Sequence, residues 1–297
     1  MHPTKLALLF ALTGLVAACG GGGNDGVDSG TPVVTPVGDA TGKFIDSEVA
    51  GLNYNCGGVT GVTGNLGEFQ YITGQNCTFS IGGIALGSAM AAPLLYPVSL
   101  VPGAEPGVDN AAVTDIARLL QSLDSDGDPN NGIVISEAVR TALATSTLPA
   151  FGSSGFAAAA DTAVKKAIPA RALVDATTAA DHLDLSLVNL WSGAYQCQYF
   201  ATVSGVKTQL GVVALSIAEG VITGAGTPTG GTSSFDVDGF VKASGLANLD
   251  AAGGTTSTGA TFEGKFTSNG TAAGTTAAGT WSDPDASATG TWACQHS

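Results

Sequence analysis

The stretch from Leu123 to Glu137 reads LDSDGDPNNGIVISE, with aspartates at every second position, then two asparagines and a glycine. Carboxylate and amide oxygens at alternate positions can converge on one cation, and calcium is held by oxygen ligands of this kind. The stretch therefore predicts a calcium site. Its candidate ligands are Asp124, Asp126, Asp128, Asn130, Gly132 and Glu137.

With Asp126 in the first position, the stretch resembles the calcium-binding loop of EF-hand proteins. Glu137 then falls at the twelfth position, where EF-hands place a bidentate glutamate. Ile133 falls at the eighth position, where EF-hands place the apolar residue that pairs with a partner loop. The sequence departs from the pattern at Asn131, because EF-hands have glycine there. A second register begins at Asp124 but lacks an acidic residue at its twelfth position.

An ordinary acidic turn between two helices is the alternative interpretation of the same residues. Aspartate side chains in such turns accept hydrogen bonds from nearby backbone amides instead of binding a metal. If calcium binds, the expected role of the ion is structural, because a loop of modest affinity suffices at extracellular calcium concentrations. The sequence leaves both interpretations open.

Few other residues suggest chemistry. Of the three histidines, His2 belongs to the leader, His296 is the penultimate residue and His182 lies in a helical segment. No nucleophile elbow, phosphate-binding loop or zinc-protease helix motif occurs. Two pairs of nearby acids fit solvated faces, because catalytic acids normally need burial to raise a pKa. These pairs are Asp236 with Asp238 on a predicted strand and Asp181 with Asp184 on a predicted helix. We therefore predict no catalytic residues and no enzyme activity.

Residues 1–18 predict a secretory signal peptide. Lys5 precedes an apolar run, Leu6 to Ala18, that is too short to span a bilayer. The tetrapeptide Val16-Ala17-Ala18-Cys19 resembles the lipobox of bacterial lipoproteins. This resemblance implies cleavage before Cys19, lipidation of its sulfur and anchoring through the acyl chains. Gly20 stands where lipoproteins of the inner membrane usually have aspartate, which implies the outer membrane and leaves the leaflet open.

Residues 19–42 predict a flexible tether after the lipidated cysteine. Glycine, proline and small polar residues dominate this segment, which cannot bury enough apolar surface to offset its ordering entropy. The whole chain has 10 basic and 24 acidic residues and a formal net charge of -14. Nucleic-acid binding needs clustered basic residues, so we expect no nucleic-acid partner.

The cysteines beyond the tether predict disulfides, because the predicted compartment is oxidising. They are Cys56, Cys77, Cys197 and Cys294, and no CxxC pair typical of zinc sites is present. Of the three pairings that four cysteines allow, proximity and the strand pattern favour Cys56 with Cys77 and Cys197 with Cys294. The first bridge would close a hairpin. The second would join the first and last strands of a C-terminal domain.

Residues 43–188 predict a β-hairpin module followed by helices. Polar and apolar residues alternate at 68–71 and 77–82, and residues 64–67 supply a turn. The run GVTGVTGNLGEFQY resembles the hairpins of carboxypeptidase-regulatory-like and other prealbumin-like sandwich modules, which implies a spacer or a binding part. Helical periodicity predicts helices over 109–123, 136–143, 155–168 and 175–190, the first with Asp109 or Asn110 as its N-cap.

Residues 189–297 predict an antiparallel β domain. Small or polar residues alternate with apolar ones between glycine turns, in about seven or eight short strands that form a barrel or a sandwich. Gly-Thr-Trp occurs at 279–281 and again at 290–292. Together with the short alternating strands, this pattern resembles avidin-like, lipocalin-like and other surface-lipoprotein β-barrels. We expect the tryptophans to plug an end of the barrel; the alternative is that they stack on a ligand. The predicted fold class is α+β with an all-β C-terminal domain.

These features predict a cell-envelope lipoprotein with a binding or structural role at the cell surface, stabilised by calcium. Its expected contacts are the outer membrane, through the lipid anchor, and an envelope protein. The alternative is a carrier of a small apolar ligand in the C-terminal barrel, which requires a barrel wide enough to leave a cavity.

Overall fold

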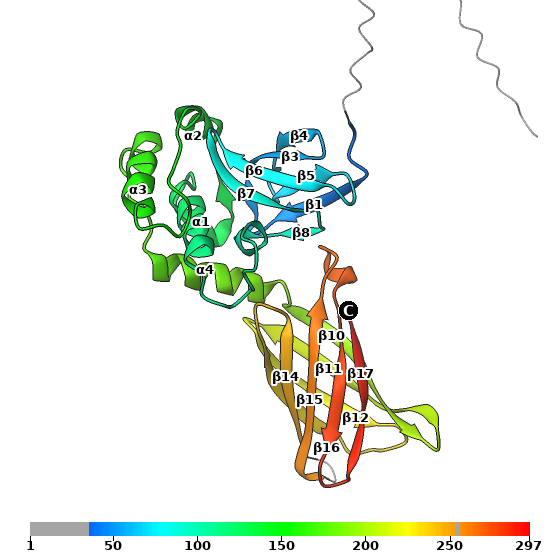
Figure 1. Cartoon of the computed structure of the whole chain (residues 1–297). Helices are drawn as coiled ribbons and strands as arrows, with labels where there is room; N and C mark the ends of the chain where they lie inside the picture. Colours follow the sequence, from blue (N-terminus) through cyan, green and yellow to red (C-terminus); the bar gives the residue numbers. More distant parts are fainter. Residues whose placement is uncertain (1–35, 254–255) are drawn as a thin grey trace, which may run out of the picture. The chain divides into compact units, whose positions relative to one another are not determined.

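The computed structural model describes residues 36–253 and 256–297. Within them the chain has an α+β N-terminal part, from Ala40 to Asn189, and a closed antiparallel barrel, from Gly193 to His296 (Figure 1). The predicted α+β class with an all-β C-terminal domain is confirmed. Of the two architectures left open for that domain, the structure has the barrel. The predictions for the signal peptide, for Cys19 and for most of the tether lie outside the described residues.

Two small sheets, of three and four strands, form most of the β part of the N-terminal half, beside a parallel pair of two-residue strands. In the first, β1 (Ala40–Phe44) lies between β5 (Glu68–Tyr71) and β8 (Leu94–Leu95). The folded part thus begins slightly before the boundary predicted at Lys43. The strands of the second sheet, in spatial order, are β4 (Val59–Val62), β3 (Asn53–Cys56), β6 (Asn76–Ile81) and β7 (Ile84–Met90).

The turn at residues 64–67 links these two sheets and does not close the predicted hairpin. Strand β4 pairs with β3, whereas β5 pairs with β1. The Gly67 N–H donates to the Gly64 carbonyl at 3.0 Å, and Gly67 has a positive φ of 74° that favours glycine. Cys56 and Cys77 form the predicted disulfide, but they join β3 to β6, which are not consecutive strands. Alternation identifies strands and leaves their partners open.

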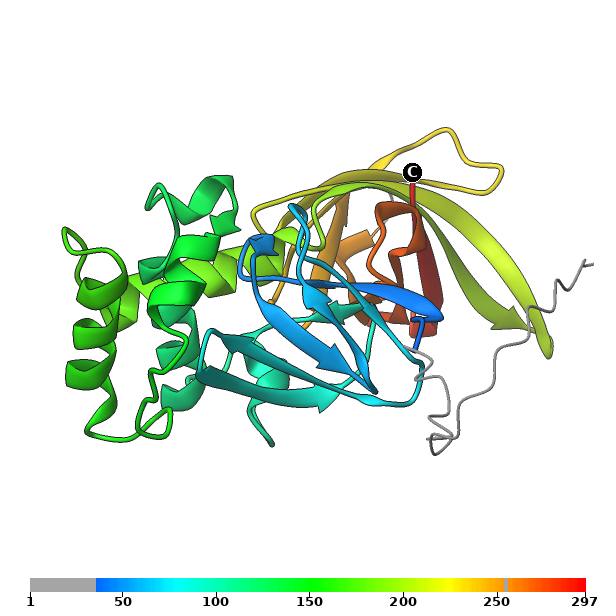
Figure 2. The same cartoon turned by 90° about the horizontal axis from the view of Figure 1, so that it is seen from above.

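Four helices follow the sheets, close to the predicted ranges: α1 (Ala111–Ser122), α2 (Glu137–Ala142), α3 (Phe156–Ala167) and α4 (Ala176–Asn189). The Asn110 side chain caps α1 by accepting from the N–H of Ala112 at 3.0 Å. The helices gather on one side of the two small sheets (Figure 2). The shared core joins Phe44 and Phe79 of the strands to Ile116 of α1. In the described ranges, no helix is long and apolar enough to cross a membrane.

The C-terminal barrel has eight strands, each antiparallel to the next, and β10 pairs with β17 to close it. They are β10 (Gly193–Val203), β11 (Val206–Ala218), β12 (Val221–Pro228), β13 (Phe235–Val241), β14 (Leu246–Gly253), β15 (Thr256–Thr267), β16 (Thr276–Asp283) and β17 (Ala288–His296). Cys197 lies directly opposite Cys294 across the closing pair, and both are buried and bonded, as predicted.

The two Gly-Thr-Trp repeats fit each other across β16 and β17. Register places Gly279 opposite Trp292 and Trp281 opposite Gly290, so each glycine makes room for the other repeat's indole. A Cβ at Gly279 would lie 2.7 Å from the Trp292 Nε1 and would overlap the Glu263 carbonyl oxygen. Both buried indoles donate to backbone carbonyls, Trp292 to Glu263 at 3.1 Å and Trp281 to Phe200 at 2.9 Å. The tryptophans therefore fill the barrel interior.

Gly279→Ala tests this packing. The added methyl group has no space beside Trp292, so we expect the free energy of unfolding to fall by about 1–3 kcal/mol. Urea unfolding followed by tryptophan fluorescence measures it. The matched control is Ala278→Ser, a neighbouring residue that is exposed on the outer face. Equal unfolding midpoints for the two variants would contradict the packing.

The disulfide at the closing strand pair gives a second prediction. Cys197 and Cys294 are 97 residues apart, and opening a loop of that length frees about 4–5 kcal/mol of unfolded-state entropy. We expect the double variant Cys197→Ala/Cys294→Ala to lower the fluorescence-detected stability more than Cys56→Ala/Cys77→Ala does. The latter opens a loop of 21 residues, worth about 3 kcal/mol. The reverse order of midpoints would refute the account of barrel closure.

Candidate functional site

The acidic loop lies between the end of α1 and the short strand β9 (Ile133–Val134). β9 runs parallel to β2 (Val49–Ala50), and the Ile133 N–H donates to the Glu48 carbonyl at 2.9 Å. Ile133, at the eighth position of the EF-hand register, therefore pairs with Val49 of β2 and not with a second loop. This strand pair fixes the C-terminal side of the loop.

The carboxylates of the loop accept hydrogen bonds from its own amides. Asp124 accepts from the N–H groups of Gly127 at 2.9 Å and Val134 at 2.8 Å, one on each oxygen. Asp126 accepts from the Asp128 N–H at 2.9 Å and from the Asn131 side chain at 3.0 Å. Asp128 caps the 3₁₀ turn η2 (Pro129–Asn131) in the same way, by accepting from the backbone and side chain of Asn130. These are the bonds of an acidic turn.

The two leading aspartates differ in their surroundings. Burial raises the pKa of Asp124, and the neighbouring Asp126 raises it further. Asp126 is exposed, and hydrogen bonds from Asp128, Asn131 and Asp124 lower its pKa to about 2. Burial thus makes the charged form of Asp124 less favourable than that of Asp126.

The candidate calcium ligands do not form a cage in this arrangement. Calcium needs several oxygens that point at one centre, but those of Asp124 and Asp126 point at N–H groups. Gly132, with a φ of 104°, turns the chain into β9, and Glu137 is the exposed first residue of α2. Over residues 36–253 and 256–297, no group of three or more His, Cys, Asp or Glu side chains is arranged to hold a metal ion. Calcium binding stays a prediction.

A buried polar cluster lies next to this loop, and sequence analysis missed it. Asp46 follows β1 and has no exposed surface. The Gln121 side chain of α1 donates to both of its carboxyl oxygens at 3.3 Å, and also to the Ala179 carbonyl of α4 at 3.1 Å. The side-chain amide of Gln121 therefore connects α1 both to the segment after β1 and to α4. No local signal could have identified Asp46, because an aspartate after a strand normally indicates an exposed turn.

His182 of α4 completes the cluster. Its Nε2 lies 3.2 Å from the Ser47 Oγ, 3.3 Å from the Ser186 Oγ and 3.9 Å from the Asp46 Oδ1. In a serine-histidine-aspartate triad the serine and the aspartate contact different ring nitrogens. Here the side-chain contacts with Ser47, Ser186 and Asp46 all involve Nε2, which differs from the arrangement of a triad. The geometry is that of a structural junction.

Burial keeps the junction uncharged. Removal from water raises the pKa of Asp46 from 3.8 to about 8, opposed by the hydrogen bond from Gln121. Burial also lowers the pKa of His182. Near neutral pH the expected pair is therefore a protonated Asp46 beside a neutral His182, which avoids two desolvated charges.

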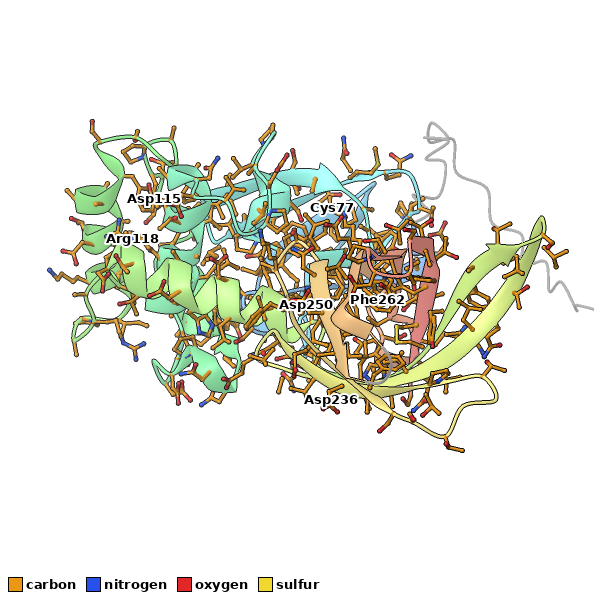
Figure 3. All side chains as sticks on the ribbon, turned by 90° about the horizontal axis from the view of Figure 1, so that it is seen from below. Cys77, Asp115, Arg118, Asp236, Asp250 and Phe262 are labelled. Carbon is orange, nitrogen blue, oxygen red and sulfur yellow. A yellow bond between two sulfur atoms is a disulfide. The ribbon has the colours of Figure 1, made fainter. Side chains whose placement is uncertain are left out.

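Other acids lie on the helices and on the barrel strands, among them Asp115, Asp236 and Asp250 (Figure 3). Asp115 of α1 accepts from Arg118 at 3.2 Å and from the Gly152 N–H at 2.9 Å, which fastens the loop before α3. The carboxylate pairs identified in the sequence are exposed on their elements, as predicted: Asp236 and Asp238 on β13, and Asp181 and Asp184 on α4. Asp250 of β14 lies opposite Asp238. Neither a family model nor a curated protein sequence matches the chain.

Asp46→Asn tests the neutral junction. An unfolded aspartate releases its proton near pH 4, whereas folded Asp46 holds it up to about pH 8. Its contribution to stability is therefore complete below about pH 4 and is lost as the pH rises to about 8, by at most about 1.4 kcal/mol per pH unit. The variant lacks this loss. The difference between its free energy of unfolding and that of the wild type should therefore shift in favour of the variant as the pH rises from 5 to 8.

Urea unfolding followed by the helical circular dichroism signal measures this difference. The matched control is Asp181→Asn, which changes an exposed aspartate of α4. If Asp46→Asn and the wild type keep a constant stability difference over this pH range, Asp46 is charged in the fold and the neutral junction is wrong.

Proposed function

We propose that this protein is a cell-envelope lipoprotein that is anchored through Cys19 and presents its barrel in a binding or structural role. The apolar run before Cys19 and the small-residue tether after it support the anchor. The two disulfides, one in each half of the chain, support an oxidising location outside the cytoplasm. We place the protein at the outer membrane, with an envelope protein as its partner.

The observation that carries the binding or structural role is the filled barrel. Its inward face holds buried apolar and aromatic side chains, among them Tyr195, Phe266 and Trp292. Its outward face carries hydroxyl pairs, such as Thr261 with Ser282 at 3.0 Å and Thr267 with Thr276 at 3.1 Å, and also exposed apolar side chains such as Phe240. A barrel of this kind offers its outer surface and its loops for contact.

The alternative function, a carrier of a small apolar ligand, places that ligand inside the barrel. Ligand pockets usually enclose about 300–1,000 Å³. The space among Tyr199, Leu215, Phe262 and Trp292 measures about 20 Å³, enough for about one water molecule. A carrier would therefore need these side chains to move apart, so we rank the binding or structural role first. No catalytic role is part of this proposal.

Metabolic labelling with palmitate tests the anchor. We expect the wild-type chain to take up label and to fractionate with the outer membrane, because lipidation at Cys19 holds it there. Cys19→Ala should lose both label and membrane association. Cys197→Ala/Cys294→Ala is the control, since it removes cysteines that are disulfide-bonded in the fold. Label that persists in Cys19→Ala would exclude Cys19 as the lipid site.

A further inference from the structure

Arg171, in the segment between α3 and α4, reaches the acidic loop from 47 residues away in sequence. Its backbone N–H donates to the Ile168 carbonyl at 2.9 Å, which anchors it at the end of α3. Its Nη1 donates to the Asp124 carbonyl at 2.7 Å. Arg171 is thus held at its backbone by the end of α3 and at its guanidinium by the loop.

The guanidinium also packs on the apex of the loop. A Cβ at Gly127 would lie 2.6 Å from the Arg171 Nη1 and 2.8 Å from its Nη2, so a larger residue there would displace the guanidinium from the loop. Gly127 also has a φ of 85°, which favours glycine independently. The positive charge of Arg171 therefore lies against the loop that carries Asp124, Asp126 and Asp128.

We infer that Arg171 is the resident cation of the loop 124–132, so that this loop keeps its shape without a divalent metal ion. A guanidinium is always charged and offers five donors, so it can neutralise the carboxylates while bonding to the backbone. The oxygens of Asp124 and Asp126 are engaged by N–H groups. The residues thus fit an acidic turn closed by arginine better than an EF-hand loop.

Thermal unfolding of the full chain in detergent, followed by the helical circular dichroism signal, tests this inference. We expect the same wild-type midpoint in excess chelator and in millimolar calcium, because no metal holds the loop. Arg171→Met should lower the midpoint by several degrees. Lys165→Met is the control, because it removes the same charge from an exposed residue of α3.

Two results would overturn the inference. One is a wild-type midpoint that falls in chelator or rises with calcium, which would assign the loop to the metal. The other is a midpoint of Arg171→Met no lower than that of Lys165→Met, which would remove the special role of Arg171. The wild-type comparison needs no variant, so the test holds even if Arg171→Met does not fold. Neither result bears on the lipid anchor.

Discussion

The register between β16 and β17 is the constraint on which the barrel depends. It places each tryptophan of the Gly-Thr-Trp repeats opposite the glycine of the other repeat. The neighbouring register between β17 and β10 places Cys197 opposite Cys294 inside the same barrel. A slip of β17 by one residue would turn Trp292 and Cys294 to the outer face, which would undo both the packing and the disulfide. The packing of the barrel interior, the closure of the barrel and the formation of its disulfide therefore all require the same strand register.

In the N-terminal half, hydrogen bonds between polar side chains connect the elements. Its strands are short, and polar side chains connect them to the helices: Gln121 bridges Asp46 and α4, and Arg171 holds the loop after α1. Buried polar groups are stable only when each has a partner. Within the described residues, no buried side-chain nitrogen or oxygen lacks a hydrogen bond. Hydrogen-bonded polar side chains therefore stabilise the N-terminal half, as the apolar interior stabilises the barrel.

The sequence predicted the elements well where a local pattern exists. Apolar periodicity and the Asn110 cap placed α1, and cysteine spacing paired both disulfides. Strand alternation could not choose between barrel and sandwich, nor show that the turn at 64–67 joins two sheets. The spacing of the aspartates gave their positions but not the direction of their oxygens. Arg171 and Asp46 were missed because their roles come from tertiary contacts across the chain.

We propose that the barrel, which its own side chains fill, acts through its outer surface. Native mass spectrometry of the protein purified from the cells that make it tests this claim most directly. The account predicts a mass that corresponds to the polypeptide and its covalent lipid alone. An additional small apolar molecule that is bound without a covalent bond and is released on unfolding would contradict the claim and favour the carrier.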